Sequence, residues 1–356
     1  MKKNPIKIAL IGAGKVTNHY KEILSSNNIK NFKIVGICDI KQELAKFYAD
    51  FWKCKYFNNL RDMIKKTNPD LIFVLTPSGL HYEHTREALK LNCHVLVEKP
   101  ISMIPSQARE LQNLARSKSL MLCVAFQNRL NPAITALHGA CINNRFGKII
   151  CSTIRLRWCR YQEYYEDGWH GTWAQDGGVI NQQAIHHLDA LNWLVGPVEK
   201  LCSTSENMLN KLEAEDSMVA ILRFKNGALG TIEATTAARP HDYEASLSIV
   251  GEKGLVVVGG TALNKIETWN FVDKVPEDEI IPEKYSNNVK NGYGNSHALL
   301  IKKIIENIQN EIISPVITLE ESIQTTELVH ALYSSDETNT WVNLRNNPIS
   351  NKLGRN

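Results

Sequence analysis

The sequence predicts an α/β protein: a doubly wound parallel sheet at the N-terminal end, followed by an α/β domain built on a large, mostly antiparallel open sheet. Three observations predict this fold class. Short apolar runs alternate with helix-like segments up to about residue 125. After Gly147, long runs of alternating apolar and polar residues dominate, which is the pattern of half-buried strands. Asn226-Gly227 separates two of these runs and is a strong signal for a β-hairpin.

The change of pattern also predicts how the chain is divided. A length of 356 residues favours two domains. We expect a first domain over residues 1–126, a second over residues 127–345, and a loose polar tail over residues 346–356.

The first domain is expected to alternate strands with helices, which implies parallel strands joined by helical crossovers. Its predicted strands are residues 6–11, 33–38, 70–75, 93–98 and 120–126. Its predicted helices begin at the glycine turn after the first strand and cover residues 81–91 and 105–119. In the second domain the predicted strands are residues 149–158, 217–224, 228–235, 246–250 and 255–258. Its predicted helices are residues 182–194, 296–309 and 319–334.

Composition excludes several classes of protein. A hydrophobic fraction of 43% and a charged fraction of 22% are ordinary for a globular protein. The formal charge is only +4 and no basic cluster carries interleaved aromatic residues, which argues against a nucleic-acid partner. No apolar run approaches the length of a membrane span. We therefore expect no membrane partner. The eight cysteines form no CxxC pair and no zinc-like spacing, which fits a reducing compartment, so we expect a cytoplasmic protein.

A glycine-rich turn follows the first predicted strand. The segment Gly12-Ala13-Gly14-Lys15-Val16-Thr17 opens a helix, and the second predicted strand ends at Asp39. This is the dinucleotide fingerprint in its strand–turn–helix–strand setting. Gly12 makes the tight turn, and Gly14 lets the backbone approach the pyrophosphate at the helix N-terminus. Asp39 would accept hydrogen bonds from ribose hydroxyls and repel a 2′-phosphate, so the expected cofactor is NAD.

One position departs from the fingerprint. Thr17 occupies the third glycine position, which serves the packing of helix on strand. We expect a slightly altered approach of the helix to the sheet, with the cofactor still bound.

The tripeptide Glu98-Lys99-Pro100 follows a predicted buried strand. Ligands bind at the carboxyl ends of strands in open α/β sheets, so Lys99 is placed where substrate chemistry occurs. A lysine fixed at such a position is unfavourable unless it has a chemical role. The alternative is an ordinary surface lysine at the end of a strand.

A second polar cluster begins after Gly177-Gly178. Gln182, His186 and Asp189 follow at i, i+4 and i+7, which places them on one helix face. A histidine on a polar face behind a glycine turn suits proton transfer. The alternative is a structural histidine that bonds to nearby backbone. Two adjacent histidines raise the possibility of zinc, but no third ligand lies at metal spacing, so we expect no metal.

These motifs, taken together and in this order, resemble the Gfo/Idh/MocA oxidoreductases over nearly the whole chain. The resemblance implies an NAD-binding Rossmann domain and a second domain that binds substrate and builds dimers or tetramers. It also implies that Lys99 and His186 are catalytic. Many members carry aspartate four residues before the histidine, where this chain has Gln182. Glutamine cannot take up a proton, which leaves His186 and Lys99 to handle it. The cofactor-binding residues implied are Gly12, Gly14, Lys15, Val16, Asp39, Thr76, Pro77, His81, Glu98, Lys99 and Gln127.

A narrower group within the family is also similar. Residues 127–129, 160–165, 168–173, 181–183, 250–254 and 293–294 resemble segments of the UDP-N-acetyl-glucosaminuronate 3-dehydrogenases. That similarity implies oxidation of the C3 hydroxyl of a UDP-linked sugar used in bacterial surface polysaccharides. The substrate-binding residues implied are Lys99, Arg129, Arg157, Arg160, Tyr164, Gln182, Gln183, His186 and Tyr293.

Several alternatives stay open. We favour His186 as the base and Lys99 as the polarising group, although either could be the base. Arg129, Arg157 and Arg160 suit a carboxylate or a diphosphate, but each could instead form a salt bridge on a strand surface. The substrate could be UDP-N-acetylglucosamine, or a free polyol of the inositol or glucose type. A non-catalytic NAD(H) sensor and an NAD-using glycosidase are further possibilities on the same fold.

Overall fold

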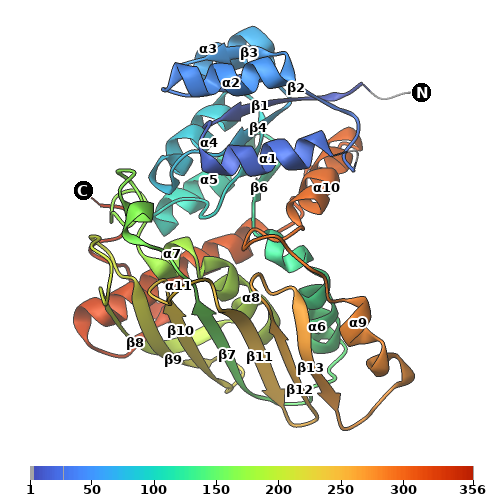
Figure 1. Cartoon of the computed structure of the whole chain (residues 1–356), viewed down its shortest axis with the longest axis vertical. Helices are drawn as coiled ribbons and strands as arrows, with labels where there is room; N and C mark the ends of the chain where they lie inside the picture. The colour runs from blue at the N-terminus through green and yellow to red at the C-terminus, as the bar shows by residue number, and fades with distance from the viewer. Residues whose placement is uncertain (1–3, 27, 356) are drawn as a thin grey trace. The chain divides into compact units, whose positions relative to one another are not determined.

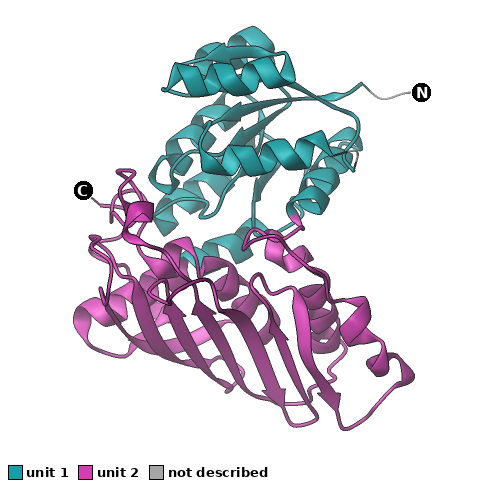
Figure 2. Cartoon of the chain, in the orientation of Figure 1, with its two compact units in different colours: residues 1–126, 297–326 teal, residues 127–296, 327–356 magenta. Residues whose placement is uncertain are grey.

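The computed structural model describes residues 4–26 and 28–355. The chain forms two compact units (Figure 2). Unit 1 comprises Met1–Phe126 and His297–Thr326, and unit 2 comprises Gln127–Ser296 and Glu327–Asn356. Each unit is described separately below.

Unit 1 is built on a six-stranded parallel sheet with the order β3-β2-β1-β4-β5-β6 (Figure 1). The strands are β1 (Ile6–Ile11), β2 (Phe32–Cys38), β3 (Lys55–Phe57), β4 (Leu71–Val74), β5 (His94–Val97) and β6 (Leu122–Val124). This order is that of a doubly wound dinucleotide-binding sheet, whose switch point lies between β1 and β4. The predicted fold class is therefore confirmed for this unit. The short strand β3 is half-exposed and lacks the apolar run that predicted the other five.

The helices of unit 1 are α1 (Lys15–Ser25), α2 (Gln42–Trp52), α3 (Leu60–Thr67), α4 (His81–Lys90), α5 (Pro105–Ser117), α10 (His297–Gln309) and the short η1 (Ser78–Leu80). α10 was expected in the second domain, yet it packs with α1 and β1. It does so because its apolar face, which includes Leu300, Ile301 and Ile304, is fully buried there.

Unit 2 is built on an eight-stranded sheet with the order β13-β12-β11-β7-β10-β9-β8-β14. The strands are β7 (Ile149–Arg157), β8 (Val198–Glu206), β9 (Ser217–Phe224), β10 (Leu229–Thr235), β11 (Glu244–Gly251), β12 (Gly254–Gly259), β13 (Lys265–Phe271) and β14 (Val342–Asn343). All pairings are antiparallel except that of β10 with β7. The predicted hairpin at Asn226-Gly227 joins β9 to β10, and the mostly antiparallel sheet is confirmed.

Helices cover one face of this sheet. The helices of unit 2 are α6 (Pro132–Ile142), α7 (Val179–Gln182), α8 (Ile185–Val195), α9 (Ile281–Lys284) and the part of α11 (Leu319–Thr338) from Glu327 onward; α11 begins in unit 1. The unit also has the short helical turns η2 (Gln127–Leu130), η3 (Gln162–Tyr165), η4 (Pro276–Glu279) and η5 (Leu344–Asn346). α8 packs on β7 and β11, and α6 packs on β12. Along β9 the alternate residues Met218, Ala220 and Leu222 are buried against this layer, while Val219 and Ile221 are exposed. No helix in the described ranges is both long and apolar enough to cross a membrane.

The C-terminal tail was predicted to be loose, and this prediction is wrong for its described residues. Ser350 and Leu353 are fully buried. The Ser350 hydroxyl and the Asn351 N–H both donate to the Glu337 carboxylate near the end of α11. His330 Nδ1 accepts a hydrogen bond from the Ser350 N–H at 3.1 Å. These tertiary bonds hold a segment whose polar composition alone predicted mobility.

Candidate functional site

The glycine turn of unit 1 connects β1 to α1. Gly12 has φ +96°, and a Cβ atom at this position would lie 2.5 Å from the Leu75 carbonyl oxygen, so only glycine fits. A Cβ atom at Gly14, the N-cap of α1, would meet no atom within 4 Å. The first glycine is therefore required because a side chain there would collide with the backbone that follows β4. The second glycine leaves the N-terminus of α1 open. An open helix N-terminus fits the pyrophosphate of a dinucleotide.

Thr17, at the third position of the fingerprint, is fully buried. Its hydroxyl donates to the Gly12 carbonyl oxygen at 2.8 Å. The side chain that replaces glycine thus ties the first turn of α1 back to the tight turn.

Asp39 follows β2 and supports the same turn. Its Oδ2 accepts from the Ala13 N–H at 2.7 Å, and its Oδ1 accepts from the Lys41 N–H at 2.8 Å. A carboxylate has about four lone-pair sites, so both oxygens can still accept a ribose hydroxyl. Asp39 therefore shapes the glycine loop in addition to the cofactor role that its position predicts.

His81, at the start of α4, joins two loops at the carboxyl edge of the sheet. Its Nδ1 lies 2.7 Å from the Pro100 carbonyl oxygen, and its Nε2 lies 2.8 Å from the Thr76 carbonyl oxygen. The ring is fully buried, which lowers its pKa although both carbonyls oppose this effect. A neutral ring has one N–H, so it donates to one of the two carbonyls at a time. In this way His81 links the end of β4 to the loop that carries Lys99.

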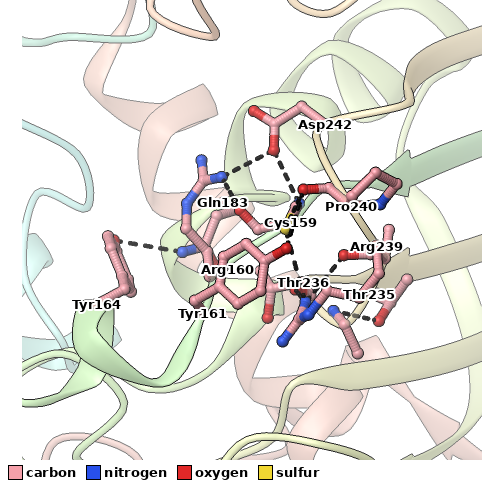
Figure 3. A network of polar contacts seen from close by, with 12 residues as sticks. Cys159, Arg160, Tyr161, Tyr164, Gln183, Thr235, Thr236, Arg239, Pro240 and Asp242 are labelled. Carbon is pink, nitrogen blue, oxygen red and sulfur yellow. Dashed lines mark hydrogen bonds and ion pairs between the residues drawn. The ribbon is translucent and has the colours of Figure 1, made fainter.

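In unit 2, Arg160 lies just after β7 and is held on three sides (Figure 3). Its Nη1 donates to the Cys159 carbonyl oxygen at 2.6 Å and to Asp242 Oδ1 at 2.9 Å. The guanidinium lies over the rings of Trp158 and Tyr164, 5.1 and 5.5 Å from their centroids. Its Nε and Nη2 have no hydrogen-bond partner within the described part of the chain. One edge of a fixed guanidinium therefore stays available to an anion.

Arg160 and Asp242 line a widely open surface cavity of about 470 Å³, all of whose lining residues belong to unit 2. The other lining residues are Cys159, Tyr161, Pro240, His241, Thr261, Lys290, Asn291 and Gly292. The cavity joins the segment after β7 to three segments distant in sequence, and it contains two cationic side chains beside one carboxylate. Such a mixture of charged and aromatic groups suits a polar, anionic small molecule.

Arg239 contacts Tyr161, one of the residues that line this cavity (Figure 3). Its guanidinium lies 4.5 Å from the centroid of the Tyr161 ring and donates to the Asn210 side-chain oxygen at 3.2 Å. The loop that carries Asn210 is held by the buried Asp216 carboxylate, which accepts from the backbone N–H groups of Met208, Leu209 and Asn210. Arg239 was not predicted from the sequence, because it contacts Tyr161 and Asn210, which lie far from it along the chain and leave no local pattern.

Tyr164 and Gln183, both predicted substrate residues, lie together. The Gln183 Nε2 donates to the Tyr164 hydroxyl at 3.4 Å (Figure 3). The Tyr164 ring also packs against His170, with ring centroids 4.1 Å apart. Burial, with a contribution from nearby Asp176, raises the Tyr164 pKa well above its usual value. The tyrosine is therefore a neutral hydrogen-bonding group and not a base.

Arg129 and Arg157 are already paired with carboxylates. Arg129 makes two bonds of 2.7 Å to Asp189, and both side chains are almost fully buried. Arg157 binds Glu233 at 2.6 and 2.9 Å and Glu244 at 3.1 Å on the neighbouring strands. These ion pairs are the structural alternative that the sequence left open for both arginines. They also place Asp189 inside unit 2, in contrast to the polar helix face predicted for it.

The segment that carries His186 is shaped by a buried carboxyl group. The helix predicted from Gln182 onward begins three residues later, because the short α7 ends at Gln182 and α8 begins at Ile185. Glu215 Oε1 accepts from the Ile180 N–H at 3.0 Å and from the Tyr333 hydroxyl at 3.0 Å. A Cβ atom at Gly178 would lie 2.2 Å from Glu215, so this glycine is needed for the close approach. Burial raises the Glu215 pKa to about 8.

The two adjacent histidines differ in environment. His187 is fully buried, and burial lowers its pKa to about 4, so its ring is neutral. His186 is half-buried at the start of α8. Only His186 is thus accessible for proton transfer. Within the described ranges, no three His, Cys, Asp or Glu side chains group so as to hold a metal ion.

Comparison with known proteins agrees with this description. Residues 6–126 match the family described as "Oxidoreductase family, NAD-binding Rossmann fold", and residues 140–344 match "Oxidoreductase family, C-terminal alpha/beta domain". The chain belongs to the Gfo/Idh/MocA oxidoreductase family. The predicted family resemblance is therefore confirmed.

Two solved structures are similar to this Gfo/Idh/MocA oxidoreductase over almost its full length. The WlbA dehydrogenase of Bordetella pertussis, in complex with NADH and UDP-GlcNAcA, has a TM-score of 0.91 at 31% identity and covers 96% of this chain and 99% of its own. The WlbA dehydrogenase of Chromobacterium violaceum, with the same two ligands, has a TM-score of 0.89 at 31% identity and covers 96% and 97%.

One curated relative is named as a sugar dehydrogenase. The D-glucoside 3-dehydrogenase of Escherichia coli (strain K12) is 26% identical, over 97% of this chain and 99% of the relative. With the NAD-binding domain and the open glycine turn, this makes the chain an NAD-dependent sugar dehydrogenase.

The predicted site residues of this oxidoreductase are distributed over both units. Unit 1 contains Gly12, Gly14, Lys15, Val16, Asp39, Thr76, Pro77, His81, Glu98 and Lys99, while unit 2 contains Gln127, Arg129, Arg157, Arg160, Tyr164, Gln182, Gln183, His186 and Tyr293. The structure brings the first set together around the turn and the carboxyl edge of the sheet. In the second set it brings together Arg160, Tyr164 and Gln183.

Proposed function

We propose that this sugar dehydrogenase oxidises the C3 hydroxyl of UDP-linked N-acetylglucosaminuronate. The observation that carries the proposal is the available edge of Arg160 in a cavity of unit 2. A carboxylate that binds a fixed guanidinium gains a charge-assisted hydrogen bond. The similarity to two WlbA dehydrogenases that bind NADH and UDP-GlcNAcA supports this assignment.

The proposed chemistry divides between Lys99 and His186. His186, half-buried at the start of α8, would take the proton of the C3 hydroxyl. Lys99, at the carboxyl edge of the parallel sheet, would hold the oxygen on which charge develops. NAD, when bound at the glycine turn, supplies a hydride acceptor. Gln182 can orient a hydroxyl but cannot take a proton.

One observation favours a second candidate, a UDP-N-acetylglucosamine 3-dehydrogenase. Asp242 lies 2.9 Å from Arg160 and offsets part of its charge, which weakens the attraction for a substrate carboxylate. In that case Arg160 and Lys290 would bind the diphosphate of a neutral sugar.

Steady-state kinetics on the two UDP sugars distinguish the candidates. A charge-assisted contact contributes about 1.5–3 kcal/mol, which corresponds to a preference of roughly ten- to a hundredfold for the uronate. Arg160→Ala should remove this preference. Arg155→Ala is the matched control, because Arg155 is an exposed arginine of β7, the strand that precedes Arg160. Equal specificity constants for both sugars in the wild-type protein, or a preference for the neutral sugar, would contradict the uronate assignment.

We also propose that the protein is a homo-oligomer, a dimer or tetramer, that uses the uncovered face of the unit 2 sheet. Val219, Ile221 and Leu229 are about half exposed on this face, at 54%, 48% and 52%. They lie next to Thr231 and Arg223 on the paired strands β9 and β10. A patch that mixes apolar and polar groups in this way is typical of a surface that binds a second copy.

The setting we propose is the cytoplasm, in the biosynthesis of a surface polysaccharide. All eight cysteines are unpaired thiols, although several are only half-buried, which supports a reducing compartment. The product of C3 oxidation is a 3-oxo sugar, which is suited to a following amination.

A further inference from the structure

Several polar groups of unit 1 converge on the carboxylate of Glu98, the residue before Lys99. The Tyr20 hydroxyl donates to Oε1 at 2.8 Å, and His297 Nε2 lies 3.6 Å from the same oxygen. The Lys99 backbone N–H donates to Oε2 at 3.3 Å. Glu98, His297 and Tyr20 are 8%, 2% and 0% exposed. A buried carboxylate with this many donors is held in one position.

The donors come from elements far apart in sequence. Tyr20 lies on α1, and His297 is the first residue of α10. His19, also on α1, extends the cluster: its Nε2 lies 3.3 Å from His297 Nδ1. If His297 carries its proton on Nε2, facing Glu98, its Nδ1 can accept from His19. All donors then point towards the carboxylate.

The charge of this cluster is negative beside Lys99. Burial alone would raise the Glu98 pKa, but His297, Lys99 and Tyr20 outweigh it and hold the pKa at about 2. Burial, together with His297, lowers the His19 pKa to about 4, so this ring is neutral. Glu98 is thus an ionised carboxylate that lies outside the glycine turn.

Among the residues that the structure describes, the titratable groups coupled to this cluster lie on four elements and in the Lys99 loop. They are His19 and Tyr20 on α1, His297 on α10, His81 on α4, Cys123 on β6 beside Tyr20, and Lys99 itself. His81 has both ring nitrogens against carbonyl oxygens, and the Cys123 thiol is buried with a pKa raised to about 11. Of these groups, Glu98 is the anion that couples electrostatically to Lys99, whose backbone N–H it also binds.

We propose that Glu98 is a positioning residue that keeps Lys99 in its ammonium form, and that Tyr20 and His297 hold Glu98 in place for this role. An opposite charge within about 4–6 Å favours the charged form of a lysine. An ammonium group can donate to the developing oxyanion but cannot take a proton. The inference therefore rests on the proposed function and deepens it, because it leaves His186 as the base.

The test measures the titration of Lys99 directly. Full-length protein saturated with NADH is pulsed with acetic anhydride over a range of pH, and acetylation of Lys99 is followed by mass spectrometry. In the wild type, Lys99 should reach half-reaction at a pH no lower than the exposed Lys90 does. A Lys99 that reacts fully near neutral pH in the wild type would overturn the proposal, and this comparison needs no variant.

Three variants sharpen the test. Glu98→Gln should move the half-reaction of Lys99 to lower pH by about one unit or more. Glu98→Asp keeps the charge and should restore most of the wild-type value, while Glu83→Gln, at an exposed site on α4, should change nothing. A Glu98→Gln protein that binds NADH normally but shows an unchanged Lys99 titration would also overturn the proposal.

The outcome is separable from that of the proposed function, because acetylation requires no sugar. If Lys99 shifts as expected while neither UDP sugar is oxidised, the proposed substrate fails and the role of Glu98 stands. If UDP-N-acetylglucosaminuronate is oxidised while Lys99 does not shift, the role of Glu98 fails alone. For an active enzyme, the limb of the kcat/KM profile due to Lys99 should move to lower pH in Glu98→Gln.

Discussion

Lys99 and Asp39 are the two residues of unit 1 whose side chains we expect to have the largest effect on activity and cofactor binding. Lys99 stands at the carboxyl edge of the parallel sheet, where ligands of doubly wound proteins bind. Asp39 is bound to the glycine loop through the Ala13 N–H. We propose that the first residue acts on substrate chemistry and the second on the cofactor, so the two roles can be tested independently.

Lys99→Ala should bind NAD normally, because the glycine turn and Asp39 are unchanged. Turnover should fall by about two to four orders of magnitude, as expected when a positioned proton-transfer or oxyanion group is lost. Steady-state kinetics and NAD titration measure both effects, with Lys90→Ala on the exposed face of α4 as control. A variant that keeps a tenth or more of the wild-type turnover would refute the assignment of Lys99.

Asp39→Asn should shift cofactor preference towards NADP, since it removes the carboxylate that repels the 2′-phosphate. The amide oxygen can still accept from the Ala13 N–H, so the loop is kept. Asp39→Ala should weaken both cofactors in addition, because it also loses that 2.7 Å bond. Fluorescence titration with NADH and NADPH measures the ratio, with Asp62→Asn as control. Equal use of NADP and NAD by the wild-type protein would show that Asp39 does not select the cofactor.

At the residue scale, the sequence predicted the site residues that belong to a local motif. Gly12, Gly14 and Asp39 could be assigned because the fingerprint has a fixed order and spacing. The contact of Arg160 with Asp242 joins residues 82 positions apart and leaves no local pattern. For the same reason the sequence could not separate Arg160 from Arg129 and Arg157, whose partners lie on other elements.

At the scale of elements, the turn before α7 depends on Glu215. This buried carboxyl group binds the Ile180 N–H and the Tyr333 hydroxyl behind Gly178. The sequence predicted the glycine turn and the helix after it, but not the break between α7 and α8. Glu215 holds the start of α7 through contacts between distant parts of the chain, which helical periodicity does not report.

Glu215 should make stability fall as pH rises. Its folded-state pKa of about 8 is above its ordinary value of 4.5, so between these values the folded protein binds more protons than the unfolded chain. Stability therefore decreases with pH across this window, by at most about 1.4 kcal/mol per pH unit. Glu215→Gln should remove this slope. Thermal unfolding midpoints at pH 5 to 8 measure the difference, with Glu206→Gln as an exposed control. Parallel midpoint curves for wild type and Glu215→Gln would exclude this role.

At the scale of the whole molecule, both sheets were predictable in class. Unit 1 follows from alternating apolar runs and helices, and unit 2 from the period-two pattern after Gly147. The placement of α10 in unit 1 was not predictable, because an amphipathic pattern predicts a buried face but not the core in which that face is buried. The uncovered face of the unit 2 sheet is visible in the pattern of β9, whose outward residues include Val219 and Ile221.

Ile221→Glu should dissociate the proposed oligomer, since it places a charge in the middle of the uncovered sheet face. Light scattering coupled to size-exclusion chromatography measures the mass in solution. Ile40→Glu is the control, because Ile40 is an exposed apolar residue of unit 1. A wild-type protein that elutes as a monomer at micromolar concentration would contradict the proposal.

The C-terminal segment has a practical consequence for anyone who handles this protein. Leu353 packs beneath Gly177, where an added Cβ would come within 2.9 Å of it, and the Gly354 N–H donates to the Trp173 carbonyl oxygen at 2.8 Å. The last residues thus form a wedge under the turn that leads to His186. An affinity tag fused at this end, or a truncation made to help crystallisation, would disturb the wedge. Because this turn leads to His186, the base that we propose, the kinetic effect would resemble that of an active-site mutation.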